Sequence, residues 1–162
     1  MGRPRAFDTD RAVETAAALF ANHGYEGTSV DDLVTATGVH RGSLYKVFGS
    51  KRSLHLTALR HHLDHEIHPS TAAIATLADP EQALAAAIAS YDNGPASGLL
   101  LLAAVERAPH DADVAALVAE GIAALEDALR PSHGDAAPQL ADTVLGARLR
   151  LRAAQPTDPE EH

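Results

Sequence analysis

The sequence predicts an all-α protein, with an N-terminal three-helix head joined by a long helix to a C-terminal helical body. Alanine is very frequent, whereas aromatic residues make up only 4% of the 162 residues, and this composition favours closely packed helices over sheets. In successive segments the apolar residues recur at helical spacing. Glycine and proline separate these segments, without internal repeats or a long low-complexity linker. Because 46% of the residues are hydrophobic, the chain can bury a real core.

The first helix is predicted from about Asp10 to Asn22. Asp8 or Thr9 can cap its start, and Gly24 ends it. Its buried stripe consists of residues at helical spacing, namely Val13, Ala16, Ala17 and Phe20.

Two short helices follow. Ser29 is a good N-cap for the first of them, and Asp32 three residues later makes an imperfect capping box. Gly38 breaks the pattern before a second short helix over residues 41–47. Two short helices separated by a tight turn that contains glycine form a helix-turn-helix. The second short helix is polar on one side, as an element that enters a DNA major groove must be.

Residues 50–154 are predicted to form the long connecting helix and the body. The connecting helix begins at Ser50 and ends near Pro69. Asp79-Pro80 starts a later helix, because proline is favoured at the first helical position. The helix over residues 97–107 is apolar nearly all round, which is typical of a buried helix. The other expected segments are a loose helix over residues 74–77, helices over 80–91, 113–129 and 139–154, a loop over 131–138 and a frayed tail from 155.

Charge is segregated along the chain, although the net charge is −9. Residues 1–60 carry eight Lys or Arg and six Asp or Glu, a net charge of +2, whereas residues 61–162 carry five and sixteen, a net charge of −11. DNA needs only a local positive face, since its attraction is screened within about 8–10 Å. The acidic body would repel DNA and orient the molecule head-first. The alternative is that the acidic surface only aids solubility.

The sequence disfavours several classes of protein. It has no cysteine, which excludes disulfides and thiolate metal sites. The start of the chain lacks the apolar segment of a signal peptide, and the longest apolar run, residues 98–105, is too short to cross a bilayer. We therefore expect a cytoplasmic protein without a membrane partner. No nucleophile motif, glycine-rich phosphate loop or carboxylate pair stands out, so we expect neither an enzyme nor a cofactor.

Residues 18–29 are ALFANHGYEGTS, and residues 38–51 are GVHRGSLYKVFGSK. Together these segments closely resemble the TetR family of bacterial regulators, over roughly residues 5–60. The body is similar to the family only in outline. The resemblance implies a helix-turn-helix DNA-binding domain over residues 1–55 and a helical dimerisation and effector-binding domain over residues 56–162.

The resemblance also implies which residues contact DNA. Thr28 and Ser29, at a helix N-terminus, would hold a phosphate. Tyr45 and Lys51 would contact the DNA backbone, and Arg41 would bind guanine in bidentate fashion. The expected DNA contacts are Arg3, Arg5, Thr28, Ser29, His40, Arg41, Gly42, Ser43, Tyr45, Lys46 and Lys51.

Two positions depart from the family pattern. His40 stands where the family usually has a small capping residue, so the recognition helix would start differently. Val47 stands where a polar residue often contacts phosphate, so one contact would be lost. The chain is also shorter than most members, which bears on the size of any ligand pocket.

A homodimer is a further implication of the resemblance. Its two heads would read successive major grooves of a pseudo-palindromic operator, about 34–36 Å apart. The last two helices would pack against their symmetry mates as a four-helix bundle, and the alternative is that their apolar faces pack only within one chain. The expected dimer residues are Leu125, Leu129, Leu140, Val144 and Leu151.

A small-molecule effector in the body is the last implication, and it makes a ligand-responsive repressor the expected function. The ligand would tilt the connecting helix and lower the affinity for operator DNA. The alternative is that the run Leu99–Leu102 is simply core. The expected ligand contacts are Leu63, Ile88, Tyr91, Leu101, Leu102, Glu106, His110 and Ile122.

Two alternative functions stay open on the sequence alone. The helix-turn-helix could serve protein interaction only, although such a module has no need of a phosphate-contact set. The second alternative is a metal sensor. The residues that suggest it could instead form a solvated helix face or a pH sensor. The candidate ligands for zinc or nickel share one helix face, namely His61, Asp64, His65 and His68.

Overall fold

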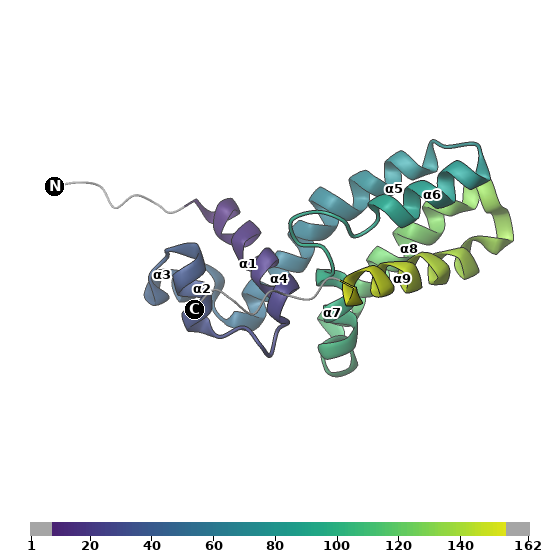
Figure 1. The fold of residues 1–162 in the computed structure, drawn as a ribbon. Coiled ribbons are helices and arrows are strands. Elements are labelled where there is room, and N and C mark those ends of the chain that lie inside the picture. Colours follow the sequence, from purple (N-terminus) through teal and green to yellow (C-terminus); the bar gives the residue numbers. More distant parts are fainter. Residues whose placement is uncertain (1–7, 155–162) are drawn as a thin grey trace.

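A computed structural model describes residues 8–154 of the chain. Within this range the regular structure is entirely helical, which confirms the predicted all-α fold. Figure 1 shows a small head and an elongated body, with α4 passing from one into the other. The head helices are α1 (Thr9–His23), α2 (Val30–Thr37) and α3 (Arg41–Phe48).

The head folds around a small apolar core, in which Phe20 is 0%, Leu33 1% and Leu44 5% exposed. Ser29 and Asp32 form a complete capping box at the start of α2, because each side chain accepts the backbone N–H of the other residue. Gly38 ends α2 at φ 67°, in the left-handed region that glycine adopts without a steric penalty. The predicted turn between the two short helices is therefore present.

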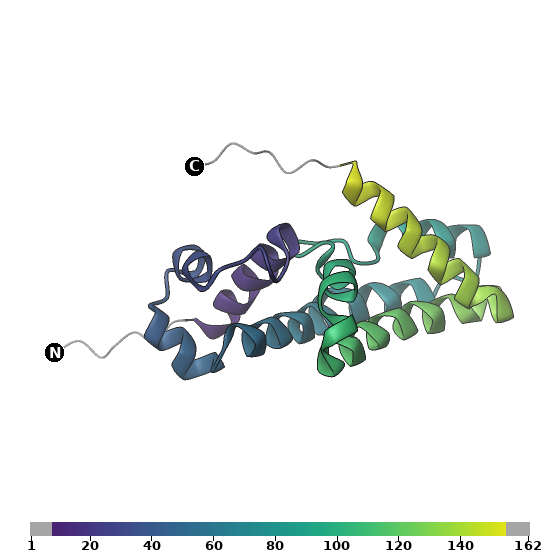
Figure 2. The same cartoon turned by 90° about the horizontal axis from the view of Figure 1, so that it is seen from below.

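One uninterrupted rod joins head and body. It consists of α4 (Lys51–His62), a π-helical turn (Leu63–Ile67) and α5 (His68–Ala75), and Figure 2 shows it running along the molecule beside α8. The predicted helix end near Pro69 is therefore wrong. Proline is tolerated in the first turn of a helix, and the π-helical turn before it shifts the hydrogen bonds, so that the N–H of His68 donates to the carbonyl of Leu63.

The body consists of the distal rod and four more α-helices. These are α6 (Pro80–Ser90), α7 (Leu99–Glu106), α8 (Ala112–His133) and α9 (Ala137–Ala153), with 3-10 turns at Ala108–His110 and Gly134–Ala136. The α8 helix packs against α5 on one side and α9 on another, and α6 packs on α5 and α9. The body core contains fully buried side chains from all these helices, among them Leu63, Ile67, Ile74, Leu99, Leu125, Leu129 and Val144.

The predicted loop over residues 131–138 is also wrong. Pro131 lies in the last turn of α8, and Pro138 lies in the first turn of α9, where a missing N–H costs little. Gly134 ends α8 at φ 55°, and its N–H donates to the carbonyl of Arg130. Within residues 8–154, no helix is both long and apolar enough to cross a membrane.

Candidate nucleic-acid interface

The α3 helix is attached to the head by one face and leaves the opposite face open. Leu44 lies in the head core, whereas Tyr45 is 43% and Val47 is 49% exposed. Arg41 and Lys46 are exposed beside them. The structure thus presents basic and hydroxyl groups together on a short helix that an apolar side chain holds in place.

Gly42 leaves the backbone of α3 accessible from outside. A Cβ at Gly42 would meet nothing within 4 Å, so packing in the head does not demand a glycine there. The missing side chain instead gives a partner close access to the helix backbone. His40 occupies the N-cap position, but its side chain caps no backbone amide, and Ser43 is half-buried.

Arg41 is held by an acidic neighbour on the preceding helix. Its Nη2 donates to Oδ1 of Asp31 at 2.5 Å, and both side chains are largely exposed. The hydrogen bond and the charge of Asp31 raise the pKa of Arg41. Exposed ion pairs contribute little, typically about 0–1 kcal/mol, so this pair can open when a stronger acceptor approaches. The sequence pattern gave no signal for Asp31 as a partner.

The expected phosphate contact by the Thr28 hydroxyl is wrong for the structure as it stands. Thr28 is 0% exposed, and its hydroxyl donates to the carbonyl of Gly24 at 2.7 Å. Ser29 is exposed, but the capping box uses its hydroxyl and its backbone N–H. These two residues therefore order the turn before α2 rather than offering unused donors.

Lys51 is also used inside the head. Its Nζ donates to the carbonyls of Tyr25 at 2.8 Å and Thr28 at 2.9 Å, and it lies 4.2 Å from the centre of the Tyr25 ring. These contacts tie the start of α4 to the turn between α1 and α2. Direct phosphate contact by Lys51 stays a prediction, and it requires these bonds to be exchanged. The expected contacts Arg3 and Arg5 lie outside the described residues.

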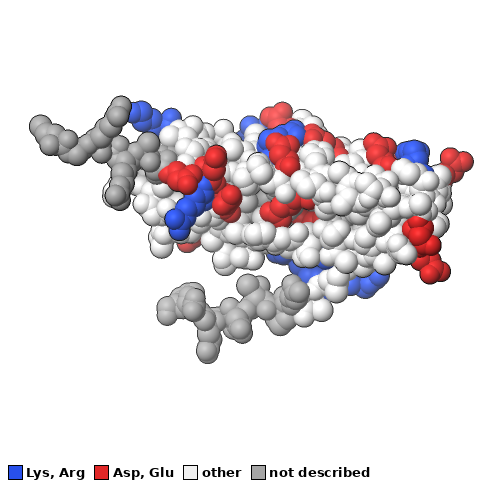
Figure 3. Space-filling model, turned by 90° about the horizontal axis from the view of Figure 1, so that it is seen from above, with Lys and Arg blue, Asp and Glu red and all other residues white. Residues whose placement is uncertain are grey.

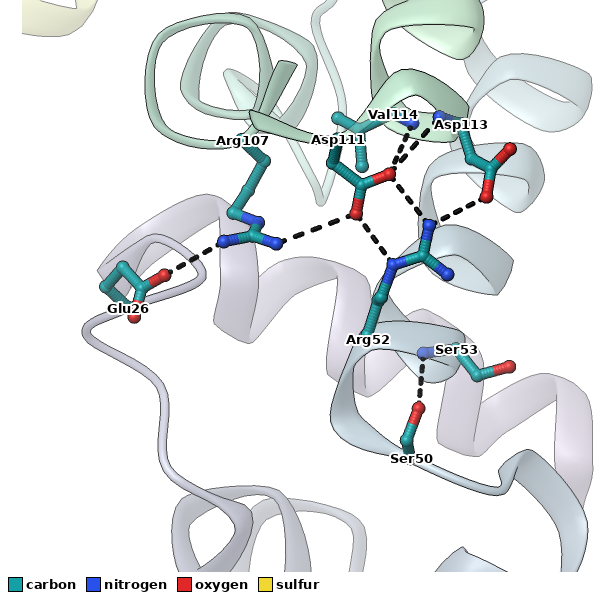
Figure 4. A network of polar contacts seen from close by, with 8 residues as sticks. All are labelled: Glu26, Ser50, Arg52, Ser53, Arg107, Asp111, Asp113 and Val114. Atoms are coloured by element: carbon teal, nitrogen blue, oxygen red, sulfur yellow. Dashed lines mark hydrogen bonds and ion pairs between the residues drawn. The ribbon is translucent and has the colours of Figure 1, made fainter. Parts of the chain in front are cut away.

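A network of ion pairs fixes the head on the body, and Figure 4 shows its parts. Arg52 of α4 makes two hydrogen bonds to the carboxylate of Asp111, at 2.7 and 2.8 Å, and a third to Asp113 at 2.7 Å. Arg107 reaches Glu26 of the head at 3.2 Å and Asp111 at 3.6 Å. The hydrogen bonds from Arg52 lower the pKa of Asp111, and those to Asp111 and Asp113 raise the pKa of Arg52. Sequence reasoning missed this junction, because its partners are far apart along the chain.

Glu106, one of the expected ligand contacts, takes part in the same junction. Its Oε2 accepts the backbone N–H of Tyr25 at 2.7 Å, and a Cβ at Gly24 would collide with its carboxylate. Glycine at position 24, with φ 74°, therefore lets α7 come close to the head.

The other expected ligand contacts differ in how deeply they are buried. Leu63 and Tyr91 are fully buried, and the Tyr91 hydroxyl donates to the carbonyl of Gly121 at 2.8 Å. His110 is exposed, whereas Ile88, Leu102 and Ile122 are half-buried. Of the expected set, Leu101 alone lines the largely polar cavity that is described below. The expected pocket stays a prediction, and its two fully buried members, Leu63 and Tyr91, lie in the body core.

The structure corrects three of the five expected dimer residues, and the other two stay predictions. Leu125, Leu129 and Val144 are 0% exposed within a single chain, since α8 and α9 pack on each other and on the rest of the body. Leu140 is half-buried, and Leu151 is 47% exposed. The alternative stated above, packing within one chain, therefore accounts for the three buried residues.

The histidine-rich face of the rod does not gather metal ligands. His61 and His65 stack with ring centres 4.0 Å apart, and His68 bonds to Glu120 of α8 at 3.0 Å. Among residues 8–154, no group of three or more His, Cys, Asp or Glu side chains is placed to hold a metal ion. The π-helical turn contributes to this, because it changes the spacing on which the expectation rested.

Charge on the molecular surface is mixed. On the face shown in Figure 3, acidic and basic side chains alternate over a mostly uncharged surface. The described part of this face therefore has no broad positive surface.

Comparison with known proteins agrees with the fold and with the helix-turn-helix. The family model described as bacterial regulatory proteins, tetR family, matches residues 12–58. The uncharacterized HTH-type transcriptional regulator YezE of Bacillus subtilis is 31% identical over 137 residues, which cover 79% of this chain and 69% of YezE. The HTH-type transcriptional repressor ComR of Escherichia coli is 46% identical over 63 residues, 39% of this chain and 30% of ComR.

A solved structure of a tetR-family regulator is similar over nearly the whole chain. A cysteine mutant of the regulator CifR, complexed with 26-bp double-strand operator DNA, matches with a TM-score of 0.77 and 25% identity, covering 95% of this chain and 92% of that one. On these grounds the chain belongs to the tetR family of bacterial regulatory proteins and is a helix-turn-helix, DNA-binding transcription regulator.

Proposed function

We propose that this protein is a repressor that binds a pseudo-palindromic operator as a homodimer and leaves it when a small molecule binds the body. The observation that carries the proposal is the open face of α3, where Arg41, Gly42, Tyr45 and Lys46 are exposed while Leu44 anchors the helix. The structure of CifR with operator DNA and the name of ComR as a repressor support it. The protein then acts on DNA in the cytoplasm by binding rather than by catalysis.

We assign the two activities to two parts of the chain. Residues 1–55 are the DNA-binding domain, and residues 56–162 are the dimerisation and effector domain. The boundary falls within α4, which belongs to both parts, and the junction of Arg52 with Asp111 couples them. A ligand that shifts the body can therefore move the head without unfolding either part.

For the dimer we propose the outward faces of α8 and α9. Ala119 and Ala123 are exposed on α8, and Leu149 is 57% exposed on α9. Small residues permit close helix approach, and an exposed leucine supplies apolar area. The two heads would then lie one helical turn of DNA apart, about 34–36 Å.

The test is a selection of bound sites from random double-stranded DNA, followed by titration of the selected site by fluorescence anisotropy. We expect an inverted repeat to be enriched and its affinity to fall steeply as NaCl concentration rises, because phosphate contacts release counterions. Enrichment of no sequence would contradict the proposal. A protein-interaction module would show binding to a partner protein that changes little with salt.

A further inference from the structure

A polar cavity lies where the head, the α6–α7 connection and α9 meet. Its volume is about 330 Å³, and its wall includes Asn22 from α1, residues 92–95, 97 and 98, and Arg148 and Arg152 from α9. Leu101 and Leu151 supply apolar parts of the wall. This volume is at the lower end of the range for small-molecule sites, about 300–1,000 Å³.

Two arginines at this cavity are held by uncharged acceptors. Arg148 donates to the carbonyl of Asp92 at 2.9 Å and to the hydroxyl of Ser97 at 3.1 Å. Arg152 donates to the carbonyls of Ser97, at 2.9 Å, and Ala21. Neither guanidinium has a carboxylate within 4 Å among residues 8–154. Within the part of the chain that the structure describes, these two charges thus have no counterion.

The loop is shaped around these arginines. Gly98 has φ 85°, and a Cβ there would lie 2.3 Å from Nη1 of Arg152. The absence of a side chain at Gly98 therefore leaves room for the guanidinium. Asp92 has φ 49° and is the one residue other than glycine with a positive φ in the described part of the chain. A backbone held in this sparsely populated region is characteristic of functional sites.

The carboxylate of Asp92 does not neutralise the arginines. Its Oδ1 lies 2.7 Å from Nε2 of His62, both side chains are almost fully buried, and Nδ1 of His62 lies 3.3 Å from Glu66. With His62 protonated, these three groups and the two arginines carry a net charge of +1. The cavity therefore attracts an anion.

We propose that this cavity binds a small organic anion, whose carboxylate or phosphate group is held by Arg148 and Arg152 and whose carbon skeleton lies against Leu101 and Leu151. Guanidinium groups bind such oxygens with two parallel, charge-assisted hydrogen bonds. Lipids and other large apolar molecules are excluded by the small, polar wall.

Binding in this cavity would affect contacts to α1, a helix of the head, and to α4, which joins the head to the body. Arg152 bonds to Ala21 in the last turns of α1, and Asp92 bonds to His62 near the end of α4. An anion that draws Arg152 toward itself weakens its bond to α1 and so alters the position of the head. This consequence rests on the proposed function, and reciprocity then requires operator DNA to weaken anion binding.

The test is thermal unfolding of the full chain without DNA, in about 10 mM inorganic phosphate, succinate or citrate against NaCl of equal ionic strength. A ligand with a millimolar Kd should raise Tm by about 3 °C or more. We expect this for at least one probe with the wild type and no shift with Arg148→Gln. Leu101→Trp fills the cavity without removing a charge and should abolish the shift as well.

Two variants serve as matched controls. Arg150→Gln changes an exposed arginine of α9 outside the cavity wall, and Arg41→Gln removes a basic group of α3; both should keep the shift. The proposal is overturned if no probe exceeds NaCl, if the shift survives in both cavity variants, or if Arg150→Gln abolishes it.

A second measurement separates this site from the proposed function. At constant ionic strength, the probe that raises Tm should weaken operator binding by the wild type and not by Arg148→Gln. Unchanged operator affinity would overturn the link to the head. Because Tm is measured without DNA, failure of operator binding and failure of anion binding are separate results.

Discussion

Basic residues of the head serve two different purposes. Lys46 is exposed on α3, and Arg41 makes only an exposed ion pair with Asp31. Lys51, in contrast, donates to two backbone carbonyls and lies over the Tyr25 ring. The first two residues are available to DNA, whereas Lys51 keeps the turn between α1 and α2 in place.

Arg41→Ala and Lys46→Ala should therefore weaken DNA binding in different ways. Loss of Arg41 should relax the preference for one base and cost about 1–3 kcal/mol on the selected operator. Loss of Lys46 should weaken all sequences alike and reduce the slope of log affinity against log salt by about 1. Anisotropy titrations with single-base operator variants over a NaCl series measure both effects. Identical behaviour of the two variants would refute these roles.

Lys51→Ala should lower the stability of the head. The carbonyls of Tyr25 and Thr28 lose their charged donor, and the Tyr25 ring loses a cation, so we expect a loss of about 1–2 kcal/mol in unfolding free energy. Urea denaturation checks this, with Lys46→Ala as the control that leaves stability unchanged. Equal stability of the two variants would argue that Lys51 only contacts DNA.

At the scale of helices, buried histidines connect elements that are distant in sequence. His55 of α4 packs edge-on against Phe20 of α1, with ring centres 4.9 Å apart. His62 of α4 bonds to Asp92 in the α6–α7 connection.

The environments of His55 and His62 have opposite effects on their pKa values. Burial lowers the pKa of His55 to about 4, with the charge of Arg107 acting in the same direction. Burial also opposes the charge of His62, but the hydrogen bond to Asp92 and the nearby carboxylate of Glu66 outweigh it and raise its pKa to about 9.

Stability should consequently be greatest near a pH of about 6.5, because this is the ordinary pKa of histidine in an unfolded chain. Below this pH, His55 takes up a proton in the unfolded chain but not in the folded protein, and stability therefore falls toward pH 4. Above it, unfolded His62 has released the proton that the folded form retains, and stability falls as pH rises through about 9. Urea denaturation between pH 5 and pH 9 measures this, and His55→Leu should flatten only the acid side. A curve without a maximum in this range would contradict the assignment.

At the scale of the whole molecule, the spacing of the two heads depends on how the two chains of the proposed dimer pack together. Leu149→Glu should convert the dimer to a monomer, because it places a charge in an apolar interface. Val105→Glu is the matched control, since Val105 is 71% exposed and belongs to α7 rather than to α8 or α9. Sedimentation velocity at micromolar concentration distinguishes the two states. A wild-type monomer, or a dimeric Leu149→Glu variant, would exclude this interface.

The helices of the head follow from residues close together in the chain. Ser29 with Asp32, Gly38, and the spacing of Val13, Ala16 and Phe20 act within a few residues, so their pattern predicts helix starts, turns and buried faces. The same kind of reasoning failed at Pro69 and Pro131. A proline usually ends a helix, but here a π-helical turn and a position in a last helical turn accommodate it.

Packing between distant segments decided what the individual side chains do. Leu125, Leu129 and Val144 have the apolar character of an interface, yet the fold buries them within one chain. Tyr91 and Leu63 are likewise fully buried in the body core.

The sequence by itself determined the helical class, the helix-turn-helix and the tetR-family relationship, because helix propensity, capping and periodicity depend on near neighbours. Only the tertiary structure decided which polar groups remain available. Lys51 with Tyr25, Arg52 with Asp111 and Arg152 with Ala21 join residues 26, 59 and 131 positions apart, and no local pattern specifies such pairs.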